Sequence, residues 1–362
     1  MGLSVGIAGL PNVGKSTLLN ALTHAGAEAS NYPFCTIEKN TGIAPVPDLD
    51  LLLLQEALTP EEAVPAAVTF VDIAGLVEGA SRGEGLGNKF LAHIREVDVV
   101  LHVVRCFEDA NVAHAAGTVD AVRDAAIVET EFLLADLDQV DRALRRAAVA
   151  AKSGKVEDRE REALLHRVRE LLERGGQVSA LEMGERDRGI VRELGLLTAK
   201  PMLYVANTGE EDPRGEGPAA AALREAKGSG RVIPVSVRVE EEIAELPPEE
   251  QAEFLAGMGL EDTALDLVVT ACYRLLDLIT YYTFANDKLR AWSLRRGRTA
   301  AEAAGQVHSD MEKGFIRAEV IALRDLLQHR TRQALHEHGL IHTVGREHVV
   351  QDRDVLQFHF KV

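Results

Sequence analysis

The chain has 362 residues, enough for two or three domains of about 150 residues each. Hydrophobic residues make up 46% and charged residues 27%, as in globular proteins, and no apolar stretch approaches the roughly 20 residues of a membrane span. The net charge of −17 argues against nucleic-acid binding through bulk charge. We therefore expect a multidomain protein whose partners include neither membranes nor DNA.

The compartment is predicted from the cysteines and the N-terminus. Cys35, Cys106 and Cys272 are too few and too scattered for a disulfide framework or a metal knuckle. The opening MGLSVGIAGLPNVGKS runs from an apolar segment directly into a glycine-rich loop, without the basic region or cleavage site of a signal peptide. Both features favour a cytoplasmic protein.

Strands and helices alternate in the first hundred residues and again after residue 200. Leucine spacing predicts a helix at 15–23. Apolar runs predict strands at 3–8, 41–46, 67–72, 98–104, 201–207 and 231–236. Apolar strands separated by helices are typical of a mostly parallel sheet with both faces covered, which makes this an α/β domain.

The intervening residues are helical and charged. Apolar residues recur at steps of three and four from Leu133 to Ala151 and from Leu164 to Leu172, with a break at 153–155. This pattern predicts an antiparallel helical hairpin inserted into the α/β domain. Two more helices are predicted at 249–255 and 264–276.

The last quarter of the chain differs from the rest in its predicted elements and in its charge. Strands are predicted at 278–284, 290–294 and 357–362, and a helix begins at Thr299, which indicates a small α+β domain. Residues 278–362 hold 13 Lys and Arg against 10 Asp and Glu, a net of +3, while residues 1–277 carry −20. Either this domain faces an anionic partner, or the difference is chance variation between domains.

The predicted organisation therefore has four segments. Residues 1–128 and 200–277 form the two parts of the α/β domain, residues 129–199 form the helical hairpin, and residues 278–362 form the α+β domain.

Residues 9–16, GLPNVGKS, match the GxxxxGK[ST] pattern of a phosphate-binding loop between a predicted strand and a predicted helix. Gly9 and Gly14 let the backbone N–H groups approach phosphates. Lys15 can neutralise the β- and γ-phosphate oxygens, and the Ser16 hydroxyl can bind Mg²⁺. The predicted nucleotide-binding residues of this loop are Asn12, Val13, Gly14, Lys15, Ser16 and Thr17.

Two further segments complete the predicted phosphate site. Asp72 ends an apolar strand in Asp-Ile-Ala-Gly, where it would hold Mg²⁺ through water while the N–H of Gly75 senses the γ-phosphate. Thr36, in NYPFCT, would close over Mg²⁺ when a γ-phosphate is present. The glycine-rich residues 79–88 are predicted to form a mobile second switch.

The base-reading loop is predicted at Asn207-Thr208-Gly209-Glu210, after a strand of the sheet. Guanine-specific proteins of this fold carry Asn-Lys-x-Asp there, and the aspartate accepts two hydrogen bonds from guanine. Here Glu210 is one methylene longer and Thr208 replaces the lysine, which favours ATP over GTP. Ser236 begins the last loop, where a backbone N–H can also touch the base.

The motifs together resemble the Obg-like ATPase (YchF) family from end to end. They are GLPNVGKS, NYPFCTIEKNTG, DIAGLVEGASRGEGLGNKFL, VVRCFED, the NTGE loop, ITYYTF, RAWSLRRG, HSDMEKGFIRAEVI and QDRDVLQFHF. The resemblance implies a P-loop nucleotide domain of the translation-factor-related class, a helical insertion and a C-terminal TGS domain. It also implies ATP preferred over GTP, and association with the ribosome through its RNA or protein.

The resemblance also implies unusual chemistry. Leu76 stands where Ras-like proteins carry a catalytic glutamine, which implies slow intrinsic turnover. Asn12 matches a position that coordinates K⁺ in some relatives, so K⁺ is a candidate cofactor. His114 matches a loop histidine proposed to activate water, and it joins Lys15, Thr36 and Gly75 as a predicted catalytic residue; an exposed loop histidine is the alternative.

Two turns depart from the family pattern. Residues 285–287, Ala-Asn-Asp, replace a glycine-containing turn, and Arg353 stands where Asp-Gly-Asp is usual. An arginine at a position that requires positive φ costs about 1 kcal/mol or forces a different turn.

The predicted function is a slow, Mg²⁺-dependent, ATP-preferring hydrolase that switches conformation at the ribosome. One alternative is an Obg-type GTPase in ribosome assembly, and another is a constitutive RNA- or ribosome-binding adaptor with a structural nucleotide. A metabolic kinase is disfavoured, because no acceptor-binding lid is recognisable.

Overall fold

The computed structural model describes residues 3–24, 40–73, 86–114, 117–258, 260 and 262–361. The chain forms two compact units, the first built mainly from residues 69–268 and the second from residues 43–68 and 269–362. None of the described helices combines the length and hydrophobicity that crossing a membrane requires.

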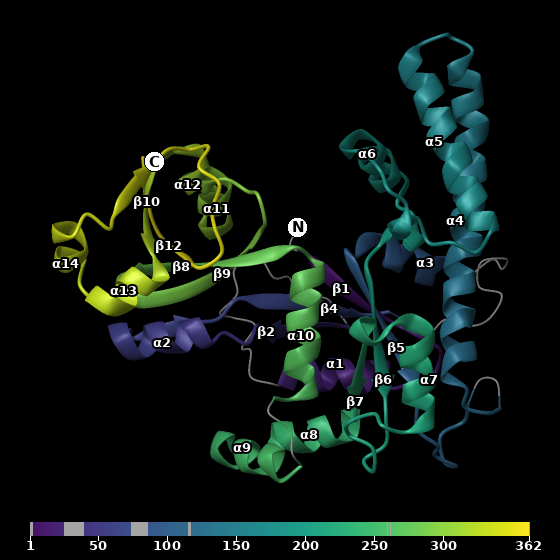
Figure 1. The fold of residues 1–362 in the computed structure, drawn as a ribbon, viewed down its shortest axis with the longest axis horizontal. Helices are drawn as coiled ribbons and strands as arrows, with labels where there is room; N and C mark the ends of the chain where they lie inside the picture. The colour runs from purple at the N-terminus through teal and green to yellow at the C-terminus, as the bar shows by residue number, and fades with distance from the viewer. Residues whose placement is uncertain are drawn as a thin grey trace. The chain divides into compact units, whose positions relative to one another are not determined.

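A six-stranded sheet with the order β2-β4-β1-β5-β6-β7 runs through the first unit (Figure 1). Its strands are β1 (Ser4–Ala8), β2 (Thr41–Pro45), β4 (Ala67–Asp72), β5 (Val99–Arg105), β6 (Met202–Asn207) and β7 (Val232–Val235). The pairings of β1 with β4 and β5, of β5 with β6, and of β6 with β7 are parallel. All residues of β5 are buried, as expected of a central strand covered on both faces. The mostly parallel α/β sheet is confirmed.

Helices follow most of these strands, and several of them contact the sheet. They are α1 (Lys15–His24), α3 (Leu86–Glu96), α4 (Ala121–Ala151), α7 (Pro218–Lys227), α8 (Val237–Glu245) and α9 (Pro248–Gly257). Helix α1 contacts α8, and α4 contacts α7 and β5. Helix α4 begins at Ala121, where the side chain of Asp120 caps it, before the boundary of 129 predicted for the helical insertion. Its first turns pack in one apolar cluster with residues of β5 and α7.

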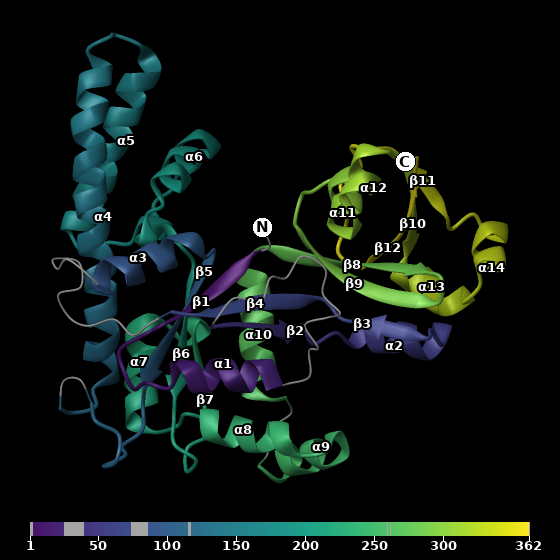
Figure 2. The ribbon, with the colours of Figure 1, turned by 180° about the vertical axis from the view of Figure 1, so that it is seen from behind.

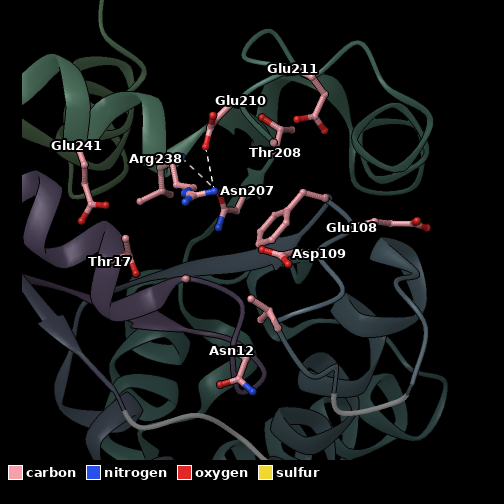
Figure 3. Close-up of a pocket in the computed structure, with 15 residues that line it drawn as sticks. Asn12, Thr17, Glu108, Asp109, Asn207, Thr208, Glu210, Glu211, Arg238 and Glu241 are labelled. Atoms are coloured by element: carbon pink, nitrogen blue, oxygen red, sulfur yellow. Dashed lines mark hydrogen bonds and ion pairs between the residues drawn. The ribbon is translucent and has the colours of Figure 1, made fainter.

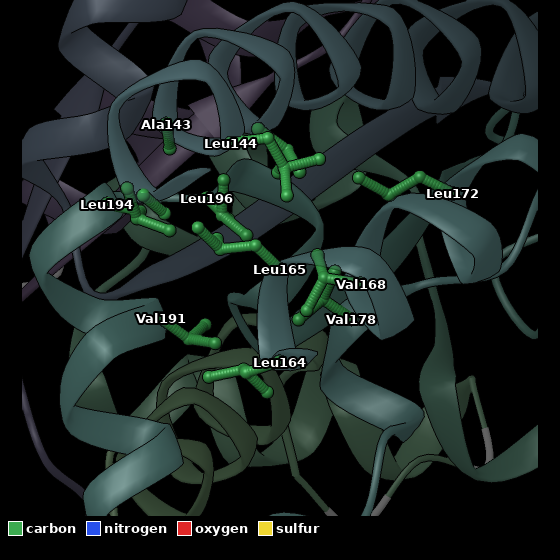
Figure 4. Packing of buried hydrophobic residues seen from close by; sticks show 12 residues of the cluster. Ala143, Leu144, Leu164, Leu165, Val168, Leu172, Val178, Val191, Leu194 and Leu196 are labelled. Atoms are coloured by element: carbon green, nitrogen blue, oxygen red, sulfur yellow. The ribbon is translucent and has the colours of Figure 1, made fainter. Parts of the chain in front are cut away.

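The insertion is a pair of long helices with smaller elements at its base. Figures 1 and 2 show the distal part of α4 side by side with α5 (Val156–Glu173). Figure 4 shows the apolar cluster that joins them, in which Leu144 of α4 and Leu165 of α5 pack with Val191 of α6 (Glu185–Leu194). Two short 3₁₀ helices, η2 (Val178–Ala180) and η3 (Leu197–Ala199), complete the segment. The apolar cluster contains most of the residues that the three- and four-residue spacing predicted to lie on one face of each long helix.

Asp136 fastens α4 to η3 through a buried carboxylate. One oxygen accepts from the N–H of Leu197 at 2.8 Å, and the other accepts from the N–H of Thr198 at 2.8 Å and its hydroxyl at 2.7 Å. Burial raises the pKa of Asp136 above its ordinary value, although these three donors oppose the shift. The carboxylate therefore satisfies donors that would otherwise be buried without partners.

We expect Asp136→Ala to lower the free energy of unfolding by about 3 kcal/mol, because it leaves these donors unpaired. Urea unfolding followed by circular dichroism measures the change. Asp138→Ala is the matched control, since Asp138 lies on the same helix but is 65% exposed and pairs with Arg142 at the surface. Equal losses in the two variants would contradict the anchoring role of Asp136.

The second unit contains a mixed sheet with the order β11-β10-β12-β8-β9-β3. Its strands are β3 (Glu62–Val64), β8 (Leu278–Ala285), β9 (Lys288–Arg295), β10 (Phe315–Ala322), β11 (His342–Val344) and β12 (Asp354–Phe360). Its helices are α2 (Leu49–Leu58), α11 (Ala300–Val307), α12 (Ser309–Lys313), α13 (Leu323–His329) and α14 (Arg332–Glu337), and α10 (Ala264–Leu275) leads into it. A small α+β fold was predicted for residues 278–362, but the unit also takes in α2 and β3 from residues 43–68.

Both turns that depart from the family pattern keep left-handed backbone conformations. Asn286 and Asp287 have φ of 51° and 57°, which suits a two-residue hairpin turn and which Asn and Asp tolerate well. Arg353 has φ of 72°, so the chain accepts a strained residue instead of forming a different turn. Its N–H donates to the carbonyl of Thr280 at 2.7 Å, and its side chain pairs with Asp50 at 2.8 Å.

Candidate nucleotide-binding site

The phosphate-binding loop lies between β1 and α1, as the sequence predicts. Gly14 has φ of 97°, and a Cβ at this position would lie 2.4 Å from the side-chain nitrogen of Asn207. Gly9 is equally constrained, because a Cβ there would lie 2.5 Å from the carbonyl oxygen of Val103. Only glycine fits either position, which keeps the loop backbone tight against the sheet.

Asn207 joins the predicted base-reading loop to the phosphate-binding loop. Its buried amide donates to the carbonyl of Val13 at 2.9 Å, and its oxygen accepts from the N–H of Val237 at 3.4 Å. Asn207 therefore fixes the relative positions of the segments predicted to hold phosphates and base. Both of these hydrogen bonds join its side chain to backbone groups.

Lys15, Ser16 and Asp72 meet at the carboxyl ends of β1 and β4. Lys15 is 8% exposed, and its ammonium donates to the carbonyl of Leu10 at 2.8 Å. Burial lowers the pKa of Lys15, and the negative charge of Asp72 opposes that shift. An anion bound in the loop would therefore find a positive charge already held in place.

The same cluster fits a magnesium ion. The Ser16 hydroxyl donates to one carboxylate oxygen of Asp72 at 2.5 Å. The other Asp72 oxygen is buried and has no hydrogen-bond partner among the described residues. A hydroxyl and a carboxylate with a spare lone pair are the hard oxygen donors that Mg²⁺ takes in nucleotide sites.

A cavity of about 640 Å³ opens beside the phosphate-binding loop (Figure 3). Four segments line it: the phosphate-binding loop and first turn of α1, residues 107–112, residues 207–211, and the first turns of α8. Its carboxylates are Glu108, Asp109, Glu210, Glu211 and Glu241. Carboxylates accept hydrogen bonds from amino and hydroxyl groups, so this rim suits the base and sugar of a nucleotide and not its phosphates.

Glu210 and Arg238 form an ion pair at this rim. Their side chains approach to 3.0 Å, with Arg238 74% and Glu210 49% exposed (Figure 3). Two nearby hydroxyls, those of Thr208 and Ser236, are buried and unpartnered within the described part of the chain. Ser236 is the N-cap position of α8, where the sequence predicted the last base-contacting loop.

His114 is not an exposed loop histidine, because its side chain is only 7% exposed. Its Nε2 lies 2.8 Å from a carboxylate oxygen of the buried Asp124, whose other oxygen accepts from Arg123. The preceding residue, Ala113, accepts a hydrogen bond at 3.2 Å from the side chain of Asn12. The histidine thus borders the phosphate-binding loop, and its part in catalysis stays a prediction.

The structure brings most of the predicted site residues into one region. Asn12, Gly14, Thr17, Asn207 and Glu210 line the cavity, and Lys15, Ser16 and Asp72 form a cluster at the same loop. Val13 accepts a hydrogen bond from Asn207, and Ser236 is the N-cap of α8, whose first turns line the cavity. The described residues do not include Thr36, Gly75, Leu76 or most of residues 79–88. Sequence reasoning missed Arg105, Phe107 and Arg238, and the one signal for Arg105 was a charge at the end of an apolar strand.

Comparison with known proteins gives matches across the chain. A family model described as 50S ribosome-binding GTPase matches residues 4–136, and one named YchF-GTPase_C, a protein of unknown function, matches residues 278–361. The ribosome-binding ATPase YchF of Haemophilus influenzae is 47% identical over 364 residues, with all of both chains covered. The chain belongs to the YchF family.

Other YchF proteins support the same assignment. The ribosome-binding ATPase YchF of Bacillus subtilis is 46% identical, again over the whole of both chains. The solved structure of the Schizosaccharomyces pombe YchF GTPase has a TM-score of 0.88 and 34% identity, covering 99% of this chain and 97% of that one. The bacterial YchF relatives are thus named ATPases and the yeast one a GTPase, so the names leave the base preference of this chain open.

Proposed function

We propose that this YchF protein is a Mg²⁺-dependent hydrolase of ATP whose nucleotide state governs its binding to ribosomes. The observation that carries the proposal is the cluster of Lys15, Ser16 and Asp72 beside a cavity with an acidic rim. The cluster supplies the positive charge and oxygen donors that a triphosphate with Mg²⁺ needs, and the rim supplies acceptors for a nucleoside.

Each side chain has a defined part in the proposed reaction. Lys15 would exchange its bond with the Leu10 carbonyl for phosphate oxygens, and Ser16 and Asp72 would hold Mg²⁺. A bound Mg²⁺ supplies charge neutralisation for the phosphates. Thr36 and Gly75 would close on the γ-phosphate, and His114 would act on the attacking water. Leu76 offers no hydrogen bond to that water, so turnover is slow.

Preference for ATP follows from the rim of the cavity. Guanine specificity relies on a carboxylate that accepts from both N1–H and the 2-amino group, whereas adenine lacks both donors. Here Glu210 is already paired with Arg238, and no lysine stands at Thr208. The amino group of adenine needs one acceptor, which Glu210 can provide. The alternative Obg-type GTPase would need Glu210 to release Arg238 and read guanine.

Titration of nucleotide-free protein with ATP and GTP in Mg²⁺ tests the base preference. We expect ATP to bind more tightly, and Glu210→Asp to raise the GTP affinity relative to ATP by about tenfold, because the shorter acid leaves Arg238 and resembles the guanine-reading residue. Glu225→Asp, at an exposed position of α7 that does not line the cavity, is the matched control. Tighter GTP binding by the unmutated protein would reverse the assignment.

Ribosome association is proposed from the names of the bacterial relatives and from the net +3 charge of residues 278–362. The partner would be ribosomal RNA or protein, in the cytoplasm, with the C-terminal α+β unit acting as a TGS domain. Co-sedimentation with ribosomes in ATP, ADP or no nucleotide tests the proposal. Equal binding in all three conditions would favour the constitutive adaptor.

A monovalent ion is the last part of the proposal. K⁺ would bind beside Asn12 and add positive charge near the phosphates. In the described structure the side-chain nitrogen of Asn12 donates to the Ala113 carbonyl, which makes the oxygen of the same amide the atom that would bind K⁺. Replacing K⁺ by Na⁺ in the hydrolysis assay checks this part by itself.

A further inference from the structure

Arg105, the last residue of β5, is a buried guanidinium that none of the proposed chemistry uses. Only 2% of the residue is exposed. Its Nε donates to the carbonyl of Phe107 at 3.0 Å, Nη1 to that of Val112 at 3.0 Å, and Nη2 to that of Asp109 at 3.1 Å. Its Cζ also lies 4.6 Å from the centre of the Phe107 ring.

The guanidinium of Arg105 donates to backbone carbonyls instead of pairing with a carboxylate in the described part of the chain. Among the described residues it forms no salt bridge with any carboxylate. A buried charge without a counter-ion is unfavourable unless hydrogen bonds compensate it. A position needed only for packing would be better filled by an apolar side chain. The hydrogen bonds to three carbonyls therefore indicate that the guanidinium fixes the conformation of the loop to which these carbonyls belong.

This loop, residues 107–112, forms one wall of the nucleotide cavity. Phe107, Asp109 and Val112 each line the cavity and each offer a carbonyl to Arg105. Beyond them, the Ala113 carbonyl accepts from Asn12 of the phosphate-binding loop, and His114 pairs with Asp124. Arg105 thus holds the loop from Phe107 to Val112, and the next two residues contact Asn12 and Asp124.

We propose that Arg105 is a positioning residue that preorganises the wall formed by residues 107–112, so that the nucleoside part of the substrate meets an ordered surface. Ligand binding is tighter when the protein does not have to order a loop during binding. The planar fork of arginine reaches three carbonyls at once, whereas lysine is a point charge with a single nitrogen. The inference rests on the proposed function, since it assigns a role within the same nucleotide site.

The test compares ATP with inorganic tripolyphosphate as ligands of the full chain. We expect Arg105→Lys and Arg105→Met to lower ATP affinity at least about tenfold, while tripolyphosphate affinity stays within about twofold because the phosphate-binding loop is intact. Isothermal titration calorimetry with Mg²⁺ measures both. Arg145→Lys, an exposed position on α4, is the matched control and should change neither affinity.

The outcomes separate this inference from the proposed function. If the unmutated protein fails to bind ATP, the proposed function is wrong. If it binds ATP and the Arg105 variants bind equally well, only the positioning role is overturned. A parallel loss of ATP and tripolyphosphate affinity would also overturn it, because that pattern reports general damage to the domain.

Hydrogen exchange on the unmutated protein covers the case in which the variants do not fold. The N–H groups of Asn111 and Val112 are both hydrogen-bonded within the loop, to the side chain and backbone of Asp109. We expect a peptide spanning residues 107–112 to be protected before nucleotide is added, with little further gain on ATP binding. Exchange at the rate of an unstructured peptide until ATP is added would overturn the proposal.

Discussion

Lys15→Ala should weaken ATP binding by about 100-fold, which corresponds to about 3 kcal/mol for the loss of a buried charged partner of the phosphates. The ammonium is already placed next to the loop backbone, held by the Leu10 carbonyl at 2.8 Å. Binding therefore needs only an exchange of acceptors and no movement of the main chain. Equilibrium titration with a fluorescent ATP analogue and competing ATP measures the change.

The same substitution should leave the nucleotide-free fold intact. Burial lowers the pKa of Lys15, which means that its charged form costs folding free energy in the absence of an anion. Removing the side chain also removes this cost, so the unfolding midpoint without nucleotide should not fall. Lys152→Ala, at the exposed end of α4, is the control for both measurements. Normal ATP affinity in Lys15→Ala would mean that phosphates bind elsewhere.

Asp72→Asn should reduce ATP hydrolysis by about 100-fold at a Mg²⁺ concentration that saturates the unmutated protein, because it removes the negative charge proposed to hold the ion. Asparagine keeps the size of the side chain and can still accept from the Ser16 hydroxyl, so the cluster geometry is retained. The variant isolates charge from packing. Steady-state release of phosphate, measured against Mg²⁺ concentration, should show a shift to much higher Mg²⁺.

The control for this substitution is Asp98→Asn. Asp98 accepts a hydrogen bond at 3.0 Å from the N–H of Ser4, at the start of β1, whereas Asp72 lies where β4 ends. Hydrolysis by this variant should match that of the unmutated protein. If Asp72→Asn hydrolyses ATP at the normal rate with an unchanged Mg²⁺ requirement, the proposed metal site is wrong.

The parallel sheet was predictable from the sequence because its strands are continuous apolar runs. Residues 67–72 and 201–207 were predicted within one residue of the observed β4 and β6. The phosphate-binding loop was predictable for a different reason, since its glycines and Lys15 have fixed spacing. An element or loop could thus be predicted wherever the residues that determine it are close together in the sequence.

Long-range pairing was not predictable in this way. Strand β3 pairs in parallel with β9, and Lys288 pairs with Glu62, a partner 226 residues away. The three-residue β3 is too short to show a period, so residues 43–68 carried no signal of the unit they join. Arg105 was missed for a similar reason: a pattern of burial indicates that a residue lies inside but not which carbonyls surround it.

The placement of residues 43–68 has a consequence for signalling along the main chain. This segment separates Thr36 from Gly75 in the sequence, and both of its ends run into strands, β2 and β4, that enter the nucleotide unit. The second unit is therefore joined to the nucleotide unit by the main chain both before and after residues 43–68, which lie between the two positions predicted to respond to a γ-phosphate. If Thr36 and Gly75 move with the bound nucleotide, as we propose, the main chain through β2 and β4 connects both of them to the segment that carries β3, and no side chain has to relay the movement.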